Sequence, residues 1–166
     1  MRSFILTLLC CLLIILSGCA SADTDPASVV VGNKAPDFSL TALDGTTVRG
    51  SALKGNIVVL NFWATWCQPC LSEIPDLKRV AASSNAKVIG IALDPDGLKT
   101  IKPFVESNQI NYTVLVGNED IFQQFNGLGI PYTLVLDRSQ RIIKIYRGPA
   151  TKEALEQDLK ALEQGA

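Results

Sequence analysis

The chain has 166 residues, of which 48% are hydrophobic and 19% are charged, and its formal net charge is −1. This length and composition fit one globular domain with a real core and exclude a disordered chain. The near-neutral charge gives no indication of nucleic acid or of an acidic membrane surface as a partner.

The N-terminus predicts a targeting segment. Arg2 is the only charge before an apolar run from Phe4 to Leu16, and this run is shorter than the roughly 20 residues of a comfortable membrane span. It ends in Leu16-Ser17-Gly18-Cys19, which resembles the bacterial lipoprotein signal, where cleavage precedes a cysteine that is then lipidated. An ordinary secretory signal and an uncleaved anchor are the alternatives.

The lipoprotein interpretation divides the chain into three parts. Residues 1–18 are the expected signal peptide, residues 19–34 a tether that begins at the lipid anchor Cys19, and residues 35–166 the folded domain. The domain is then extracytoplasmic, on the periplasmic side of a bacterial membrane, although the sequence does not distinguish inner from outer membrane. A cysteine pair in that compartment is oxidised unless something reduces it.

The first half of the domain predicts a hairpin, a buried strand and a long helix. Strand-like runs at 35–40 and 46–48 flank Asp44-Gly45, a hairpin turn signal. Residues 57–63 are almost all apolar, as in a strand that is covered on both faces. A helix is predicted from Gln68 to about Ser83, kinked by Pro75.

The second half continues this alternation. Strands are predicted at 86–93, 114–116, 132–136 and 142–146, and helices at 97–108, after Asn118 and after Thr151. Strands that alternate with helices and are followed by a hairpin and a last helix predict an α/β fold. We expect a central mixed β-sheet flanked by helices, with the N-terminal β-hairpin added to it.

Cys67 and Cys70 lie where the strand at 57–63 ends and the next helix begins. The first thiol therefore faces unpaired N–H groups at the positive end of the helix dipole, which favours the thiolate. The spacing lets the second thiol reach the first, so that attack on a disulfide and resolution of the mixed disulfide can occur in one site.

Two other interpretations of this pair are open. Half of a zinc site would need two further Cys or His ligands, but the chain has no His and its other cysteines, Cys10, Cys11 and Cys19, lie in the leader. A purely structural disulfide that closes so short a loop adds little stability. We therefore expect no metal and no cofactor beyond a redox-active Cys67–Cys70 disulfide.

Three segments carry a resemblance to a known family. The run from Phe62 to Cys70, with Pro75 five residues later, resembles the thioredoxin active-site segment, and Gly129-Ile130-Pro131-Tyr132-Thr133 resembles the cis-proline segment. With the lipoprotein leader and the opening Ala35-Pro36-Asp37-Phe38, the chain is most similar to the TlpA/ResA-like branch of extracytoplasmic thiol–disulfide oxidoreductases. The resemblance covers about residues 30–165 and implies a thioredoxin fold.

The resemblance also implies roles for polar residues. Thioredoxins keep a buried aspartate where this chain has Asn61, whereas the TlpA/ResA-like branch carries a glutamate three residues after the second cysteine, here Glu73. At i+3 this carboxylate shares a helix face with Cys70, and we expect it to accept a proton from that thiol. The alternative is that Glu73 only stabilises the first half of its helix.

Further residues are expected around the pair. Pro131 should follow a cis peptide bond, and in the family such a bond places the backbone of the preceding residue, here Ile130, where a substrate strand can pair with it; an ordinary trans proline is the alternative. Trp66 should border the substrate site. Gln68 and Pro69, between the cysteines, should tune the redox potential.

The leading functional hypothesis is a membrane-anchored protein-disulfide reductase in which Cys67 attacks and Cys70 resolves. The resemblance implies protein disulfide substrates, such as the cysteines of apocytochrome c in cytochrome c biogenesis, and a membrane thiol electron donor of the CcdA/DsbD type. We expect a monomer and no nucleic acid partner.

Two alternatives come from related folds. A peroxiredoxin would need Pro-x-x-x-Thr-x-x-Cys, but Asn61 stands four residues before Thr65 and the Thr–Cys gap is one residue short. A copper-delivery module would use Cys-x-x-x-Cys and a distant His, whereas this chain has the shorter spacing and no His.

Overall fold

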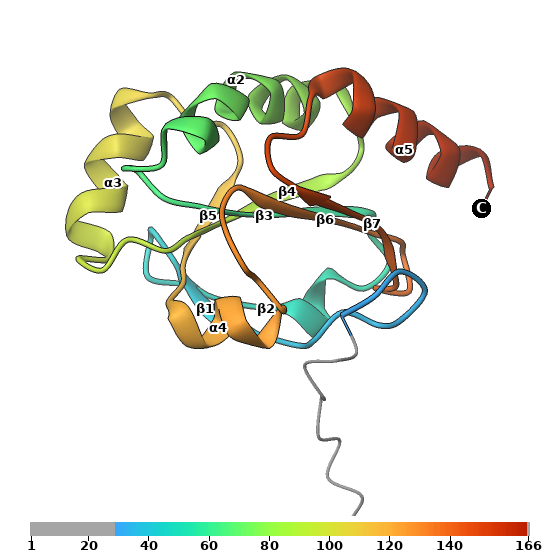
Figure 1. The fold of residues 1–166 in the computed structure, drawn as a ribbon, viewed down its shortest axis with the longest axis horizontal. Helices are drawn as coiled ribbons and strands as arrows, with labels where there is room; N and C mark the ends of the chain where they lie inside the picture. The colour runs from blue at the N-terminus through green and yellow to red at the C-terminus, as the bar shows by residue number, and fades with distance from the viewer. Residues whose placement is uncertain (1–28, 166) are drawn as a thin grey trace, which may run out of the picture.

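The computed structural model describes residues 29–165 (Figure 1). The expected signal peptide, the anchor Cys19 and the first part of the expected tether lie outside these residues. Residues 29–34, the rest of that tether, fold against the domain: Val29 is buried in the core, and the Gly32 N–H donates to the Ile142 carbonyl at 2.8 Å.

One seven-stranded mixed sheet forms the centre of the molecule, in the order β2-β1-β5-β4-β3-β6-β7. Its strands are β1 (Ser39–Ala42), β2 (Thr47–Arg49), β3 (Val58–Trp63), β4 (Lys87–Ala92), β5 (Thr113–Val116), β6 (Tyr132–Leu136) and β7 (Ile142–Arg147). The helices are α2 (Gln68–Ser83), α3 (Leu98–Ser107), α4 (Glu119–Gln124) and α5 (Lys152–Gln164), with a short 3-10 helix η2 (Gly50–Leu53) after β2.

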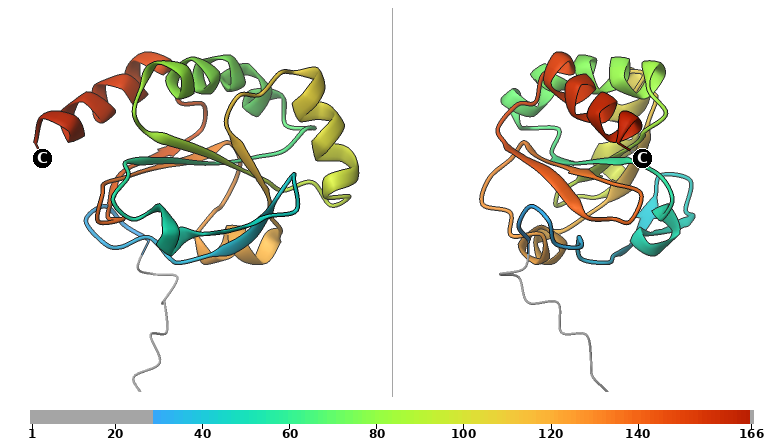
Figure 2. Two further views of the ribbon diagram at one scale, coloured as in Figure 1. Left: turned by 180° about the vertical axis from the view of Figure 1, so that it is seen from behind. Right: turned by 90° about the vertical axis from the view of Figure 1, so that its right-hand side faces the viewer.

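Helices cover both faces of the sheet. Figures 1 and 2 show α2, α3 and α5 on one side, and α4 with the N-terminal segment on the other. Strand β3 lies between β4, which is parallel to it, and β6, which is antiparallel, and all six of its residues are buried. This explains the unbroken apolar run in the sequence, because neither face of such a strand meets water. The predicted α/β thioredoxin fold is confirmed.

The added N-terminal hairpin is present, and β1 joins it to the sheet by pairing antiparallel with β5. Its first strand begins at Ser39 rather than at residue 35. Pro36 has no backbone N–H to donate to a ladder, and the carboxylate of Asp37 is engaged by the Ser51 N–H at 2.7 Å. These residues therefore form an irregular segment that brings Phe38 into the core.

Two sequence expectations concern prolines. Helix α2 continues through Pro75 to Ser83, and the peptide bond between Ile130 and Pro131 is cis. Among residues 29–165, no helix is both long and apolar enough to cross a membrane.

Candidate active site

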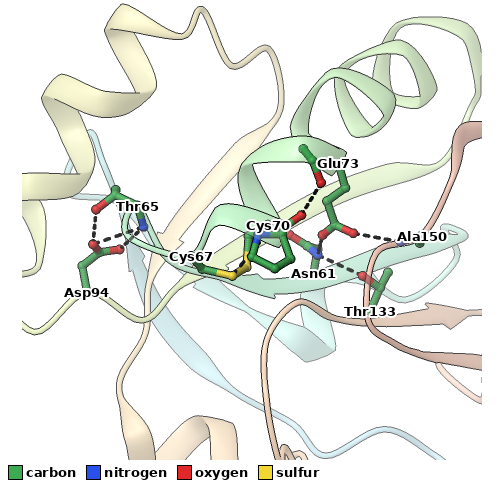
Figure 3. Close-up of a disulfide and its surroundings, with 10 residues drawn as sticks. Asn61, Thr65, Cys67, Cys70, Glu73, Asp94, Thr133 and Ala150 are labelled. Atoms are coloured by element: carbon green, nitrogen blue, oxygen red, sulfur yellow. Dashed lines mark hydrogen bonds between the residues drawn. A yellow bond between two sulfur atoms is a disulfide. The ribbon is translucent and has the colours of Figure 1, made fainter.

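The two cysteines form a disulfide at the start of α2 (Figure 3). Cys67 is the N-cap residue of this helix, and its sulfur accepts a hydrogen bond from the Cys70 N–H at 3.3 Å. Cys70 is fully buried, whereas Cys67 retains slight exposure. In the reduced protein the same N–H and the helix dipole would favour the Cys67 thiolate. The more accessible sulfur is thus also the one that the helix activates.

A buried carboxylate lies behind the disulfide. Glu73 is the third residue after Cys70, and only 2% of its surface is exposed. Its Oε1 accepts from Nδ2 of Asn61 at 2.5 Å, and its Oε2 accepts from the backbone N–H of Ala150 at 2.9 Å. Burial raises the pKa of Glu73 to about 7, and the two hydrogen bonds oppose this rise. Glu73 can therefore both take up and release a proton near neutral pH.

Asn61 links this carboxylate to the neighbouring strand. Its Nδ2 also donates to the hydroxyl of Thr133 at 2.9 Å, and the two residues are directly paired between β3 and β6. Figure 3 shows the amide of Asn61 between Glu73 and Thr133. Thr133 and the N–H of Ala150 were not found from the sequence, because only the strand pairing and the docking of α5 bring them to Glu73.

A second buried carboxylate lies on the other side of the cysteines. Asp94 follows β4 and is 4% exposed, and it accepts hydrogen bonds from the backbone N–H of Thr65 at 3.2 and 3.3 Å and from the Thr65 hydroxyl. Thr65 stands two residues before Cys67, so Asp94 fixes the loop that carries the first thiol. Sequence reasoning missed Asp94, although polar residues at the carboxyl ends of parallel strands often belong to sites.

The other expected site residues lie around the disulfide. Trp66 is 63% exposed beside Cys67, and Gln68 and Pro69 are exposed at the first turn of α2. Half-buried Ile130 packs against the cluster that contains both cysteines, whereas Pro131 is buried. Trp63 is buried in the same cluster and contributes packing.

The loop before Ile130 adds a residue that the sequence analysis did not single out. Leu128 is 83% exposed, the highest value among the exposed large hydrophobic residues of the described structure. A free apolar side chain close to the cis peptide bond is a further candidate for contact with a substrate. Within residues 29–165, no group of three or more His, Cys, Asp or Glu side chains could hold a metal ion.

Comparison with known proteins connects this geometry to a family. The model of the AhpC/TSA family matches residues 31–156. The chain belongs to this thioredoxin-like family. The thioredoxin-like protein YneN of Bacillus subtilis (strain 168) is 33% identical over 132 residues, which covers 77% of this chain and 78% of YneN.

Two further relatives are named for their chemistry. The thiol–disulfide oxidoreductase ResA of Geobacillus thermodenitrificans (strain NG80-2) is 30% identical over 144 residues, or 84% of this chain and 82% of ResA. The crystal structure of a putative thiol:disulfide interchange protein DsbE from Chlorobium tepidum is 30% identical with a TM-score of 0.74, and covers 80% of this chain and 97% of that one. Together with the Cys67–Cys70 disulfide, these relatives identify a thiol–disulfide oxidoreductase of the ResA and DsbE type.

Proposed function

We propose that this oxidoreductase reduces particular protein disulfides outside the cytoplasm, from a position anchored to the membrane by lipidated Cys19. The observation that carries the proposal is Glu73, a buried carboxylate whose pKa is raised to about 7 and which lies one helical turn from Cys70. A group that titrates near the operating pH is suited to accept and return a proton within each cycle.

The first step uses Cys67. In the reduced protein its thiolate attacks one sulfur of a substrate disulfide, which forms a mixed disulfide and releases the other substrate sulfur as a thiolate. The N-cap position supports this step, because the N–H groups of the first turn of α2 stabilise negative charge on the Cys67 sulfur.

The second step uses Cys70 and Glu73. Glu73 accepts the proton of the buried Cys70 thiol, and the resulting thiolate attacks the Cys67 sulfur and releases the second substrate sulfur. The Cys67–Cys70 disulfide forms, two electrons pass to the substrate, and the two substrate sulfurs leave as thiols once protonated. A dithiol donor then returns two electrons and two protons, which resets the cysteines and Glu73.

Substrate contact falls to the residues around Cys67. An extended substrate segment would pair with the backbone at Ile130, next to Pro131, while its side chains lie against Trp66. The exposure of Trp66 and the half-buried position of Ile130 support this proposal. Gln68 and Pro69, within the redox pair, would tune the potential.

Partners follow from the proposed location. We propose a membrane thiol electron donor of the CcdA/DsbD type, and apocytochrome c cysteines as one class of substrate. The lipoprotein-like sequence before Cys19 supports the anchor, the similarity to ResA and DsbE supports thiol–disulfide exchange, and the reducing direction follows from the resemblance to the TlpA/ResA-like branch.

A trapping experiment tests the two cysteine roles. In a Cys70→Ser variant, Cys67 attacks but cannot be released, so mixed disulfides with substrate proteins should accumulate in cells. The matched Cys67→Ser variant should trap none of them. Equal trapping by both variants, or none by Cys70→Ser, would contradict the assignment.

The direction of electron flow is tested by the reduction potential of the Cys67–Cys70 couple. Thiol alkylation across a dithiol buffer series should give a value near or below about −220 mV, the range of glutaredoxin and thioredoxin. A value near about −120 mV, like that of a strong periplasmic oxidant, would contradict the reductase proposal and point to disulfide introduction.

A further inference from the structure

The chain enters the described structure at the end of the sheet that is farthest from the disulfide. Residues 29–35 lie along the β6–β7 turn, where the Ala35 N–H donates to the Gln140 carbonyl at 2.9 Å. Val58, the first residue of β3, is paired with Leu136 at this end, whereas Phe62 is paired with Tyr132 at the end near the cysteines. In Figure 1 the N-terminal segment and the start of α2 lie at opposite sides of the molecule.

Four cations gather where the chain enters. Lys34 and Lys54 both line a depression of about 210 Å³. Arg141 and Lys34 form an isolated antiparallel β-bridge, which places their side chains close together. The carbonyl of Arg138 accepts a hydrogen bond from the N–H of Gly55, so that Arg138 lies near Lys54, the preceding residue. All four side chains are exposed. They come from three separate segments, so that the sequence shows no cluster.

Three carboxylates lie beside these four cations and leave a small positive excess. Asp37 lines the same depression as Lys34 and Lys54, where it accepts a hydrogen bond from the N–H of Ser51. Asp137 lies in the β6–β7 turn, where it accepts from the N–H groups of Ser139 and Arg141, and Glu163 shares a depression with Arg138. The opposite end of the sheet carries charges of both signs: Asp96 follows β4 and Glu119 and Asp120 begin α4, whereas Lys99 lies in the first turn of α3 and Arg147 is paired with Tyr132.

Two apolar side chains project beside these cations. Val30 is 49% exposed and Val31 is 60% exposed. They are adjacent in the turn that Arg141 holds through a hydrogen bond from its Nη1 to the Gly32 carbonyl at 2.9 Å. Apolar side chains surrounded by Lys and Arg are typical of surfaces that lie at the boundary between lipid headgroups and acyl chains.

We propose that this surface, the basic pole formed by Val30, Val31, Lys34, Lys54, Arg138 and Arg141, docks on a bilayer that contains anionic phospholipid. Its charge is complementary to such headgroups, and each Lys or Arg near an anionic surface adds to the attraction. The described structure also begins at this surface, with Val29, and the lipoprotein-like sequence precedes Val29 in the chain. A tether that starts at Cys19 therefore holds this end close to the lipid.

Docking has a consequence for the redox site. With the basic pole on the lipid, the Cys67–Cys70 disulfide faces away from the membrane, toward proteins in the aqueous compartment. Exchange with a donor inside the membrane then requires the domain to leave the surface and turn. Two valines and four cations, opposed by three carboxylates, form a surface small and weakly charged enough for such reversible binding.

The test uses residues 20–166 without the anchor. The matched DsbE structure consists almost entirely of the equivalent region, 97% of its chain, so that such a domain folds without a leader. Flotation with vesicles of phosphatidylcholine, with or without phosphatidylglycerol, separates neutral from anionic lipid. We expect binding only to the anionic vesicles, with loss at high salt because exposed charges are screened.

Charge-reversal variants locate the surface. Lys34→Glu with Lys54→Glu should lower binding about 25-fold or more, taking about fivefold for each cation lost. Lys99→Glu with Lys102→Glu changes the net charge equally, but on exposed positions of α3, and should leave most of the binding intact. Val30→Ser with Val31→Ser should cause a smaller loss.

Three outcomes would overturn the proposal: no binding to anionic vesicles, equal binding to both kinds of vesicle, or equal loss in the two charge-reversal variants. None of them bears on disulfide exchange, because the basic pole is remote from the cysteines. All variants should keep the oxidoreductase activity of the parent domain, which also shows that they are folded.

Discussion

Two buried carboxylates flank the redox disulfide, and they differ in what they hold. Glu73 lies behind Cys70 and takes its hydrogen bonds from β3 and from the N–H of Ala150, before α5. Asp94 lies on the side of Cys67, and its carboxylate accepts hydrogen bonds from one residue, Thr65. Both carboxylates are almost completely buried.

This comparison teaches that the position of a buried carboxylate, and the segment that its hydrogen bonds hold, decide its role. Burial raises the pKa of Glu73 to about 7 against the effect of its two hydrogen bonds, so that the group can exchange a proton beside Cys70. The donors of Asp94 belong to the loop that carries Trp66 and Cys67, so that this carboxylate fixes the geometry of the attacking sulfur. We therefore assign proton transfer to Glu73 and positioning to Asp94.

The largest expected effect is on the pH dependence of stability. The pKa of Glu73 in the folded protein, about 7, lies above its ordinary value of 4.5, so that the folded state binds the proton more tightly than the unfolded state. The contribution of Glu73 to stability is therefore greatest below pH 4.5, falls as the pH rises to 7, and is constant above that. This fall amounts to about 3 kcal/mol.

Urea unfolding of the oxidised protein across this pH range measures the fall. Glu73→Gln should remove it, whereas Glu106→Gln, at an exposed position of α3, should keep it. A Glu73→Gln profile parallel to that of the parent protein would show that Glu73 does not titrate in this range.

The next effect concerns catalysis. Glu73→Gln should slow resolution of the mixed disulfide about 100-fold, because a general base typically contributes a factor of this order or more, while the attack of Cys67 on a substrate should change little. Stopped-flow measurement with a disulfide substrate separates the two steps. The slowed step should also lose its pH dependence near 7. An equal slowing of both steps would indicate structural damage instead of a missing base.

A smaller effect is expected on the other side of the disulfide. Asp94→Asn turns an amide N–H₂ toward donors on Thr65, and should cost about 1–3 kcal/mol of stability through an unsatisfied buried group. It should also slow the attack by Cys67 without removing the pH dependence that Glu73 gives to resolution. Asp96→Asn, an exposed carboxylate two residues later, is the control.

A double-mutant cycle sharpens the Asp94 assignment. If Asp94 acts through Thr65, the effects of Asp94→Asn and Thr65→Val on the attack rate should not add. Additive effects would mean that Asp94 reaches Cys67 by another route.

The smallest expected effect falls on the Asn61–Thr133 hydrogen bond. Thr133→Val keeps the shape of the side chain but removes its hydroxyl, and should cost about 1 kcal/mol, the typical net value of such a bond. Thermal or urea unfolding measures it. Because Asn61 can still donate to Glu73, the pH dependence of resolution should remain; its loss would show that Thr133 is needed to orient Asn61.

Much of the fold and part of the site could be predicted from local patterns. The apolar run of β3 and the position of Cys67 at the start of α2 follow from periodicity and helix-terminus chemistry, since both depend on neighbouring residues. Glu73 is one helical turn from Cys70, so that its relation to that thiol also follows from the sequence. Its depth of burial and its raised pKa come from the covering elements.

The partners of these residues were decided by tertiary structure alone. Thr133 lies 72 positions from Asn61, Ala150 lies 77 from Glu73, and Asp94 lies 29 from Thr65. A threonine in a strand and an aspartate after one are ordinary residues, and only strand order, register and helix docking bring them to a site. The basic pole has the same origin: a net charge of −1 sums over the chain, whereas a surface potential depends on which charges the fold places side by side.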